Sequence, residues 1–330
     1  MDSRRQAESE PELSGAAGTR TRSAPLPLRA SDVQVHRVLD AASGAVICLM
    51  MVFSPWAFGT TQPWAIQTMN LAGYLLGALL AWKLFIRHAR GFPASRWGER
   101  VGDEVTSLSL KANWRLLTSS PTTVVRSLAG KATPALASLT FLILAFCFVS
   151  ALNARATYLT LAQRFDYHEC LNWLPHSLDS ARSWPAFGNY LAIACAFWAT
   201  RDWLLGRSGA EERAARAGTK TENHFFPARL RRLLWVLCLN GALLGFEGIA
   251  QRIEGSGKLL FLVTPHVNQE AIAQFGPWAY RANASQYFNL LWPVCVGFWW
   301  TLHRARGFRK AAHHTLLLCA TIMAACPIIS

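Results

Sequence analysis

The chain has 330 residues, of which 52% are hydrophobic and only 16% are charged, whereas soluble chains usually carry about 25% charged residues. The apolar residues form long runs, which are typical of membrane proteins and argue against a soluble protein. The formal net charge is +14, but the basic residues fall between the apolar runs and no nucleic-acid-binding motif is present. We therefore expect membrane lipids, and no nucleic acid, as partners.

The first segment, residues 1–37, is rich in Ser, Pro, Arg and Glu and contains almost no large apolar side chains. A segment of this composition cannot bury a core, so it is predicted to be a disordered tail. No apolar stretch follows a short basic start, which argues against a cleaved signal peptide.

Seven apolar segments follow, and most approach the roughly 20 residues that a helix needs to cross a bilayer. Because backbone groups in lipid must be hydrogen-bonded internally, each segment is predicted to be a helix. The predicted fold is all-α, a transmembrane helical bundle of about seven spans within residues 38–330. The predicted spans are Val38–Phe58, Trp64–Ile86, Pro134–Leu152, Trp184–Leu205, Leu233–Gln251, Ser285–Leu302 and Thr315–Ser330.

The distribution of Lys and Arg predicts the orientation, because cytoplasmic loops carry an excess of basic residues. With the N-terminus in the cytoplasm, the loops 87–131 and 206–232 are cytoplasmic, and the loops 153–183 and 252–284 lie outside. Only six of the 33 basic residues are then on the outer side. The others belong to the tail, the cytoplasmic loops and the inner helix ends.

The last predicted span, Thr315–Ser330, is short and has no polar residues after it to anchor it at a membrane surface. We therefore expect this chain to be the N-terminal part of a longer protein, truncated at its C-terminus. Further spans and outer loops would then follow Ser330.

The eight cysteines indicate neither a disulfide framework nor a metal site. All lie inside apolar runs except Cys170, which lies in a loop, and no CxxC pair is present. Such cysteines are typical small apolar filling residues, so neither a metal nor a cofactor is predicted.

The stretch 275–288 places an arginine, several polar side chains and several aromatic rings directly before the sixth predicted span. An arginine at the mouth of a membrane helix is costly unless an anionic group neutralises it. Arg281 is therefore a candidate contact for a lipid-linked pyrophosphate, with Asn283, Gln286 and Tyr287 as supporting hydrogen-bonding groups. The alternative is an arginine that only anchors the helix at headgroup level.

Two further candidate contacts lie in the outer loop 153–183, and a third lies inside a span. Arg155 and His176 belong to a group of possible acids, bases and phosphate contacts in that loop, although an ordinary solvated loop would have a similar composition. Glu247 lies about one turn inside the outer end of the fifth span. A carboxylate at that depth either pairs with a nearby arginine or reaches water at the interface.

Three stretches carry a family resemblance: FSPWAFGTTQPW at 53–64, NAR at 153–155 with LPHSLDSARSW at 174–184, and FGPWAYRAN at 275–283. They resemble the first outer hairpin, the second outer loop and the arginine-bearing loop of the O-antigen ligase and polymerase family of bacterial inner-membrane proteins. In that family the arginine-bearing loop leads into the core helices. The resemblance covers most of residues 38–330.

The resemblance implies a glycosyltransferase that moves a glycan from an undecaprenyl-pyrophosphate carrier to an acceptor hydroxyl on the periplasmic face of the inner membrane. In ligases the acceptor is lipid A–core, and in polymerases it is another carrier-linked glycan. The family uses no nucleotide sugar and needs no metal. Its arginine, matched here by Arg281, holds the pyrophosphate, a leaving group that needs charge neutralisation as the glycosidic bond breaks.

Two features depart from the family pattern. In the family an asparagine often follows the arginine directly, whereas Ala282 lies between Arg281 and Asn283 in this chain. The family's large outer loop, with its histidine, corresponds to sequence beyond Ser330. The general base that deprotonates the acceptor hydroxyl is therefore predicted downstream of this chain.

The sequence leaves two other functions open, a transporter or flippase for lipid-linked sugars and an inactive membrane remnant. A flippase would also need Arg281 and Glu247 to face a cavity. It would in addition predict inverted repeats or broken helices at the membrane midplane, and the sequence shows neither. A non-catalytic protein predicts that replacement of Arg281 leaves the surface glycan unchanged.

Overall fold

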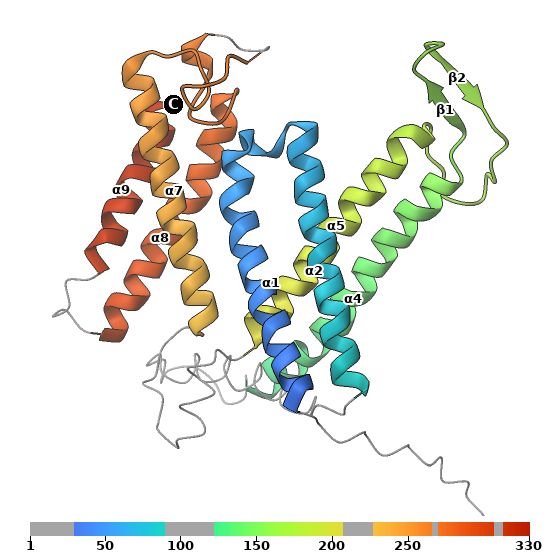
Figure 1. Cartoon of the computed structure of the whole chain (residues 1–330), viewed down its shortest axis with the longest axis horizontal. Coiled ribbons are helices and arrows are strands. Elements are labelled where there is room, and N and C mark those ends of the chain that lie inside the picture. The colour runs from blue at the N-terminus through green and yellow to red at the C-terminus, as the bar shows by residue number, and fades with distance from the viewer. Residues whose placement is uncertain (1–29, 90–121, 207–226, 266–269, 307–312) are drawn as a thin grey trace, which may run out of the picture.

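The computed structural model describes residues 30–89, 122–206, 227–265, 270–306 and 313–330. Long α-helices make up most of these residues and overlap all seven predicted spans, which confirms the predicted helical bundle (Figure 1). The helices are α1 (Ala30–Trp56), α2 (Pro63–Ala89), α4 (Thr122–Leu152), α5 (Ser180–Leu205), α7 (Ala228–Glu254), α8 (Arg281–Arg306) and α9 (His314–Ile329).

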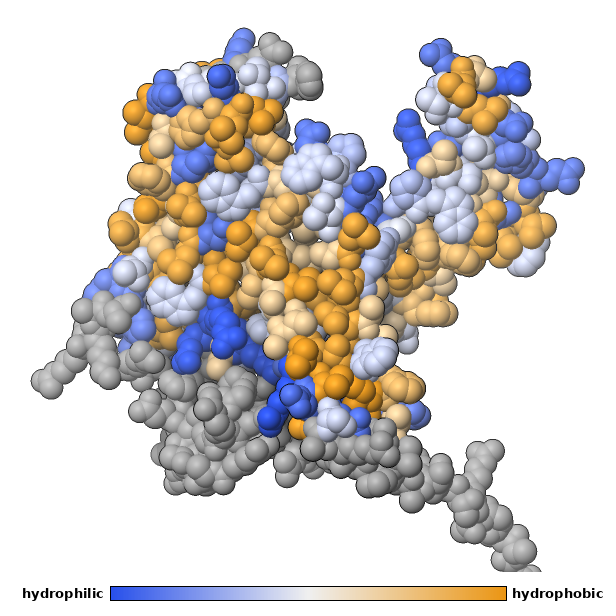
Figure 2. Space-filling model, viewed as in Figure 1, coloured by the Kyte–Doolittle hydropathy of each residue, from blue (hydrophilic) through white to orange (hydrophobic). Residues whose placement is uncertain are grey.

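Four helices of the described ranges, α1, α2, α4 and α7, are long and apolar enough to cross a membrane. Helix α9 is apolar but shorter, and α5 and α8 are long but contain several charged and amide side chains. Most large apolar side chains of α4 are exposed, and apolar residues cover much of the visible surface between the two ends of the bundle (Figure 2). An apolar surface of this extent is typical of a membrane protein.

Helix α1 begins at Ala30, inside the predicted tail 1–37, while residues 1–29 lie outside the described ranges. Its first turns are polar, but they pack beside the polar end of α2, where the Nε of Arg87 donates to the Nε2 of His36. Contacts of this kind extend the helix beyond its apolar part, and composition alone does not reveal them. Most of the predicted cytoplasmic loops also lies outside the described residues.

The outer loop between α4 and α5 contains a small antiparallel hairpin of strands β1 (Ala156–Leu159) and β2 (Arg164–Tyr167). The sequence did not predict these strands, since they are too short to show an alternating pattern. Asn153 organises the loop, because its side chain both donates to and accepts from the main chain of Leu171. Asp179 caps α5 by accepting from the amide of Ala181 at 3.0 Å, and it also accepts from the amide of Tyr158 in β1 at 3.1 Å.

The helices pack as two groups, with α1, α2, α4 and α5 in one and α7, α8 and α9 in the other. Helix α1 joins them, for instance through the hydrogen bond of 2.8 Å from the Trp56 indole to the side-chain oxygen of Asn240. The larger apolar core lies in the second group, around Phe288, Phe298 and Met323. We call the end of the bundle that carries the β1–β2 hairpin the hairpin end; α7 ends there and α8 begins there (Figure 1).

Candidate functional site

The candidate site begins with a tight turn, residues 275–278, that lies against the last turns of α7. The main chains of Phe275 and Trp278 hydrogen-bond to each other in both directions at 3.1 Å. The Phe275 ring lies over Gly248, where an added Cβ would come within 2.3 Å of the ring. Only glycine permits so close an approach, so Gly248 determines how near the turn lies to α7.

Hydrogen bonds from Gln251, which is only 3% exposed, fix the same turn. Its Oε1 accepts from the amide of Gly276, and its Nε2 donates to the carbonyl of Lys258 at 2.8 Å. Gly276 has a φ of +56°, and a Cβ there would lie 2.8 Å from the Oε2 of Glu247. The docked turn leads directly into α8, so Arg281, the first residue of that helix, lies beside the end of α7.

An open cavity of about 650 Å³ lies between the hairpin-end turns of α7, α8 and α9. Arg252 from α7 and Arg281 from α8 both line it, and no acidic side chain is among its described lining residues. The Nη2 of Arg252 and the Nη1 of Arg281 donate to the main-chain oxygen of Ser330, the last residue of this sequence, at 3.1 and 3.5 Å. Two guanidinium groups from different helices therefore converge on one acceptor.

The electrostatics of this cavity favour an anion. Guanidinium groups hold phosphate oxygens through charge-assisted, often bidentate hydrogen bonds. The start of α8 adds main-chain amides that favour negative charge, whereas the C-terminal ends of α7 and α9, which also border the cavity, carry the opposite dipole. The Oγ of Ser285 lies 2.6 Å from the Oγ of Ser330 and adds hydroxyl groups to the lining. A ligand with several negative oxygens fits this chemistry.

The polar residues predicted around Arg281 divide between two faces of α8. Arg281 and Gln286 line the cavity, but Asn283 and Tyr287 do not. Residues four apart share a helix face, so Asn283 and Tyr287 project together on another side. Asn283 is exposed, and the Tyr287 ring packs against Trp278 with centroids 5.1 Å apart. The predicted span begins at Ser285, after Arg281 and Asn283, so the sequence did not assign these two residues to a helix face.

Glu247 is not among the residues that line the cavity. Its carboxylate lies under the docked turn, beside Gly276. Both of its oxygens are buried, and neither has a hydrogen-bond partner among the described residues. The predicted pairing of Glu247 with an arginine is therefore not formed within the described ranges.

The remaining predicted contacts, Arg155 and His176, lie in the hairpin loop. Their side chains are exposed, and the main chain of Arg155 bridges Ser177 and His168 with hydrogen bonds of 2.9 and 2.7 Å. The hairpin and the ends of α7 and α8 lie on opposite flanks of the same end of the bundle (Figure 1). Neither residue lines the cavity of Arg281.

Sequence reasoning did not select Arg252 as a site residue. A basic residue in the last turn of a helix is common, because it interacts favourably with the helix dipole. What distinguishes Arg252 is its position opposite Arg281, and that depends on the docking of the 275–278 turn.

A second charge cluster lies at the opposite end of the bundle, and we call it the ion network: Asp40, Lys83, Arg87, Asp202 and Arg229. Lys83, only 1% exposed, lies 2.8 Å from Asp40 and 2.7 Å from Asp202. Arg87 also pairs with Asp202, and Arg229 with Asp40. The network joins α1, α2, α5 and α7. The sequence indicated its basic residues only as cytoplasmic charges.

Comparison with protein-family models, with curated proteins and with solved structures finds no match to this chain. Within the described ranges, no group of three or more His, Cys, Asp or Glu side chains is arranged to hold a metal ion. The functional argument therefore depends on the geometry and charge of the cavity.

Proposed function

We propose that this chain is the membrane domain of a glycosyltransferase of the O-antigen ligase type. In this proposal the cavity with Arg252 and Arg281 holds the pyrophosphate of an undecaprenyl-linked glycan. The observation that supports it is that two guanidinium groups, from α7 and α8, line one open cavity. A pyrophosphate offers several negatively charged oxygens, which guanidinium groups hold through charge-assisted hydrogen bonds.

The reaction is a displacement at the anomeric carbon of the glycan. The oxygen of an acceptor hydroxyl, on lipid A–core or on another glycan, forms a bond to that carbon, and the bond to the pyrophosphate breaks. The bonding electron pair leaves with the lipid pyrophosphate, and the hydroxyl proton passes to a base. The arginines stabilise the negative charge that develops on the leaving group, a contribution of about 100-fold or more in rate for one well-placed donor.

The proposed location is the inner membrane of a bacterium, with the N-terminus in the cytoplasm and the hairpin end in the periplasm. The excess of basic residues toward the opposite end supports this orientation. The cavity then opens on the side where carrier-linked glycans meet their acceptors. Arg155 and His176, on the other flank of that side, stay predicted substrate contacts.

The proposal is tested in cells that carry the gene, with the Arg281→Ala variant at normal protein level. We expect glycan-bearing lipopolysaccharide to disappear from a silver-stained gel. Arg182→Ala is the matched control, since Arg182 is 90% exposed in the first turn of α5 at the same end of the bundle, and the profile should not change.

Two other results would overturn the ligase proposal, the first on the gel and the second in a separate assay of the carrier-linked glycan. An unchanged profile for Arg281→Ala would indicate a non-catalytic protein. Accumulation of carrier-linked glycan on the cytoplasmic face would indicate a flippase.

A further inference from the structure

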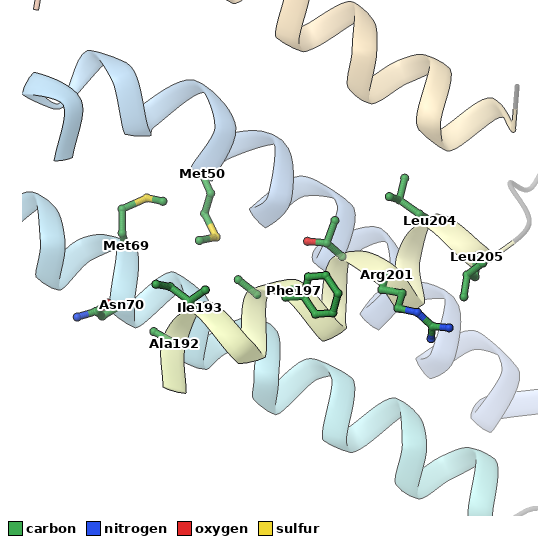
Figure 3. Close-up of a pocket in the computed structure, with 11 residues that line it drawn as sticks. Met50, Met69, Asn70, Ala192, Ile193, Phe197, Arg201, Leu204 and Leu205 are labelled. Atoms are coloured by element: carbon green, nitrogen blue, oxygen red, sulfur yellow. The ribbon is translucent and has the colours of Figure 1, made fainter. Parts of the chain in front are cut away.

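A second cavity, of about 700 Å³, forms a groove in the first helix group, with walls from α1, α2 and α5. Its lining extends from Met69 and Asn70 at one end to Arg201 and Leu205 at the other (Figure 3). The side chains between these ends are nearly all apolar. Two of the lining residues on α5, Ile193 and Phe197, are 64% and 45% exposed, so the groove opens toward the surrounding membrane.

The end of the groove away from the β1–β2 hairpin carries a positive charge. Arg201 donates from its Nη2 to the Oγ1 of Thr133 on α4 at 2.6 Å, and its guanidinium lies 5.4 Å from the centre of the Trp198 ring. These contacts hold Arg201 at the edge of the groove. A guanidinium has five N–H donors, and its planar shape suits a phosphate group.

Arg201 lies next to Asp202 on α5, and Asp202 belongs to the ion network. Arg201 is therefore at the same depth along the bundle as that network. Charged networks lie where helices leave the hydrocarbon region, because isolated charge is costly deeper in the membrane. A phospholipid places its phosphate at this level and its acyl chains directly below, toward the middle of the bilayer. The groove has the same order, with the cation at its end and apolar walls below.

We infer that this groove binds one acyl chain of an anionic phospholipid, with the lipid phosphate at Arg201. The polar end of the groove lies away from the hairpin end, so the occupant is a lipid of the opposite leaflet from the one that faces Arg281. A carrier pyrophosphate bound at Arg281 therefore has the wrong orientation for this site. The inference stands independently of the proposed glycosyltransferase.

Selectivity should come mainly from the charge. A lipid chain leaves equally apolar surroundings when it enters the groove, so the apolar walls alone give little driving force. One basic residue near the membrane surface attracts an anionic lipid by about 1 kcal/mol, or roughly fivefold in affinity. The apolar walls instead determine that the chain fits this groove in preference to the rest of the surface.

The experiment is native mass spectrometry of the full chain in detergent, with dioleoyl phosphatidylglycerol or dioleoyl phosphatidylethanolamine added at equal concentration. We expect the native chain to retain more phosphatidylglycerol than phosphatidylethanolamine, and Arg201→Gln to lose about fivefold of this preference. The matched control is Arg232→Gln, because Arg232 is an exposed arginine on α7 toward the same end, and the preference should stay.

A second variant tests the groove separately from the charge. Ala196→Trp places a large ring among the lining residues and should reduce retention of both lipids. Ala137→Trp, at an exposed position of α4, should not.

Equal retention in Arg201→Gln and the native chain, or equal losses in Arg201→Gln and Arg232→Gln, would overturn the inference. Displacement of phosphatidylglycerol from the native chain by undecaprenyl pyrophosphate, but not from Arg201→Gln, would assign the groove to the carrier lipid instead.

Discussion

The two ends of α7 use the same kind of residue in different ways. Arg229 and Arg252 are separated by about 35 Å along the helix axis, at 1.5 Å per residue. Arg229 belongs to the ion network, in which carboxylates lie between the cations. Arg252 lines a cavity in which a second arginine, and no described acidic side chain, is present. Charges that pair with each other inside the bundle are explained by folding, whereas two arginines that line an open cavity suit an anionic ligand.

The largest expected effect lies in the ion network. Lys83→Met leaves the carboxylates of Asp40 and Asp202 without the cation between them, in a site where Lys83 itself is 1% exposed. Removal of one member of a buried ion pair costs about 3–5 kcal/mol, so the free energy of unfolding should fall by this amount. Thermal unfolding in detergent, followed by tryptophan fluorescence, measures it. Lys258→Met, at an exposed lysine, is the control, and equal melting of the two variants would contradict a structural role for the network.

The next effect concerns the cavity and should leave stability unchanged. Arg281→Ala should lower the rate of glycan transfer by about 100-fold or more, because one donor to the leaving group is lost. Its free energy of unfolding should stay within about 0.5 kcal/mol of the native value, since the residue is exposed. A transfer assay with purified carrier-linked glycan, together with the same thermal measurement, separates the two effects. A large fall in the unfolding free energy of Arg281→Ala would show that the cavity arginine also has a structural role, as the ion network does, and would contradict the contrast between the two ends of α7.

A smaller effect is expected at the turn that positions the cavity. Gly276→Ala adds a Cβ at a φ of +56° and at 2.8 Å from Glu247, which should cost about 1–3 kcal/mol in unfolding free energy and weaken transfer by displacing Arg281. In the double variant Gly276→Ala with Glu247→Ala, the share of the lost unfolding free energy that comes from contact with the Glu247 carboxylate should be recovered. Gly297→Ala is the control, because an added Cβ there meets no atom within 4 Å. Equal stability of the two glycine variants would show that the turn does not depend on Gly276.

The smallest effect is expected on the other flank of the hairpin end. Asp179→Ala removes the cap of α5 and its hydrogen bond to Tyr158, which should cost about 0.5–2 kcal/mol. Faster amide hydrogen exchange in β1 and β2 would report the loosened loop, with Asp166→Ala, an exposed position in β2, as reference. Binding of an anionic ligand at Arg281 should not change, since the hairpin lies apart from the cavity. Loss of anion binding in Asp179→Ala would show instead that the hairpin and the cavity form one site.

The sequence predicted the helices well because a long apolar run in a membrane has one stable backbone solution. It also singled out Arg281, because an arginine at a helix mouth is costly without an anionic neighbour, and the role of Arg281 stays a prediction. It did not predict the ion network, because Lys83 and Asp202 are far apart in the chain and no periodic pattern connects them. Arg252 escaped prediction for a similar reason. Its meeting with Arg281 depends on the packing of Phe275 on Gly248, which is a tertiary contact.

The most direct test of the proposed function is the affinity of the purified chain for undecaprenyl pyrophosphate compared with undecaprenol, which has the same lipid chain without phosphate. Native mass spectrometry in detergent measures both for the native chain, Arg281→Ala, Arg252→Ala and the control Arg182→Ala. We predict that the native chain and the control prefer the pyrophosphate, and that each cavity variant loses at least about tenfold of that preference, as expected for a charge-assisted contact of about 1.5–3 kcal/mol. Equal affinity for the two lipids in the native chain, or an unchanged preference in Arg281→Ala, would contradict the assignment of the cavity to a lipid-linked pyrophosphate.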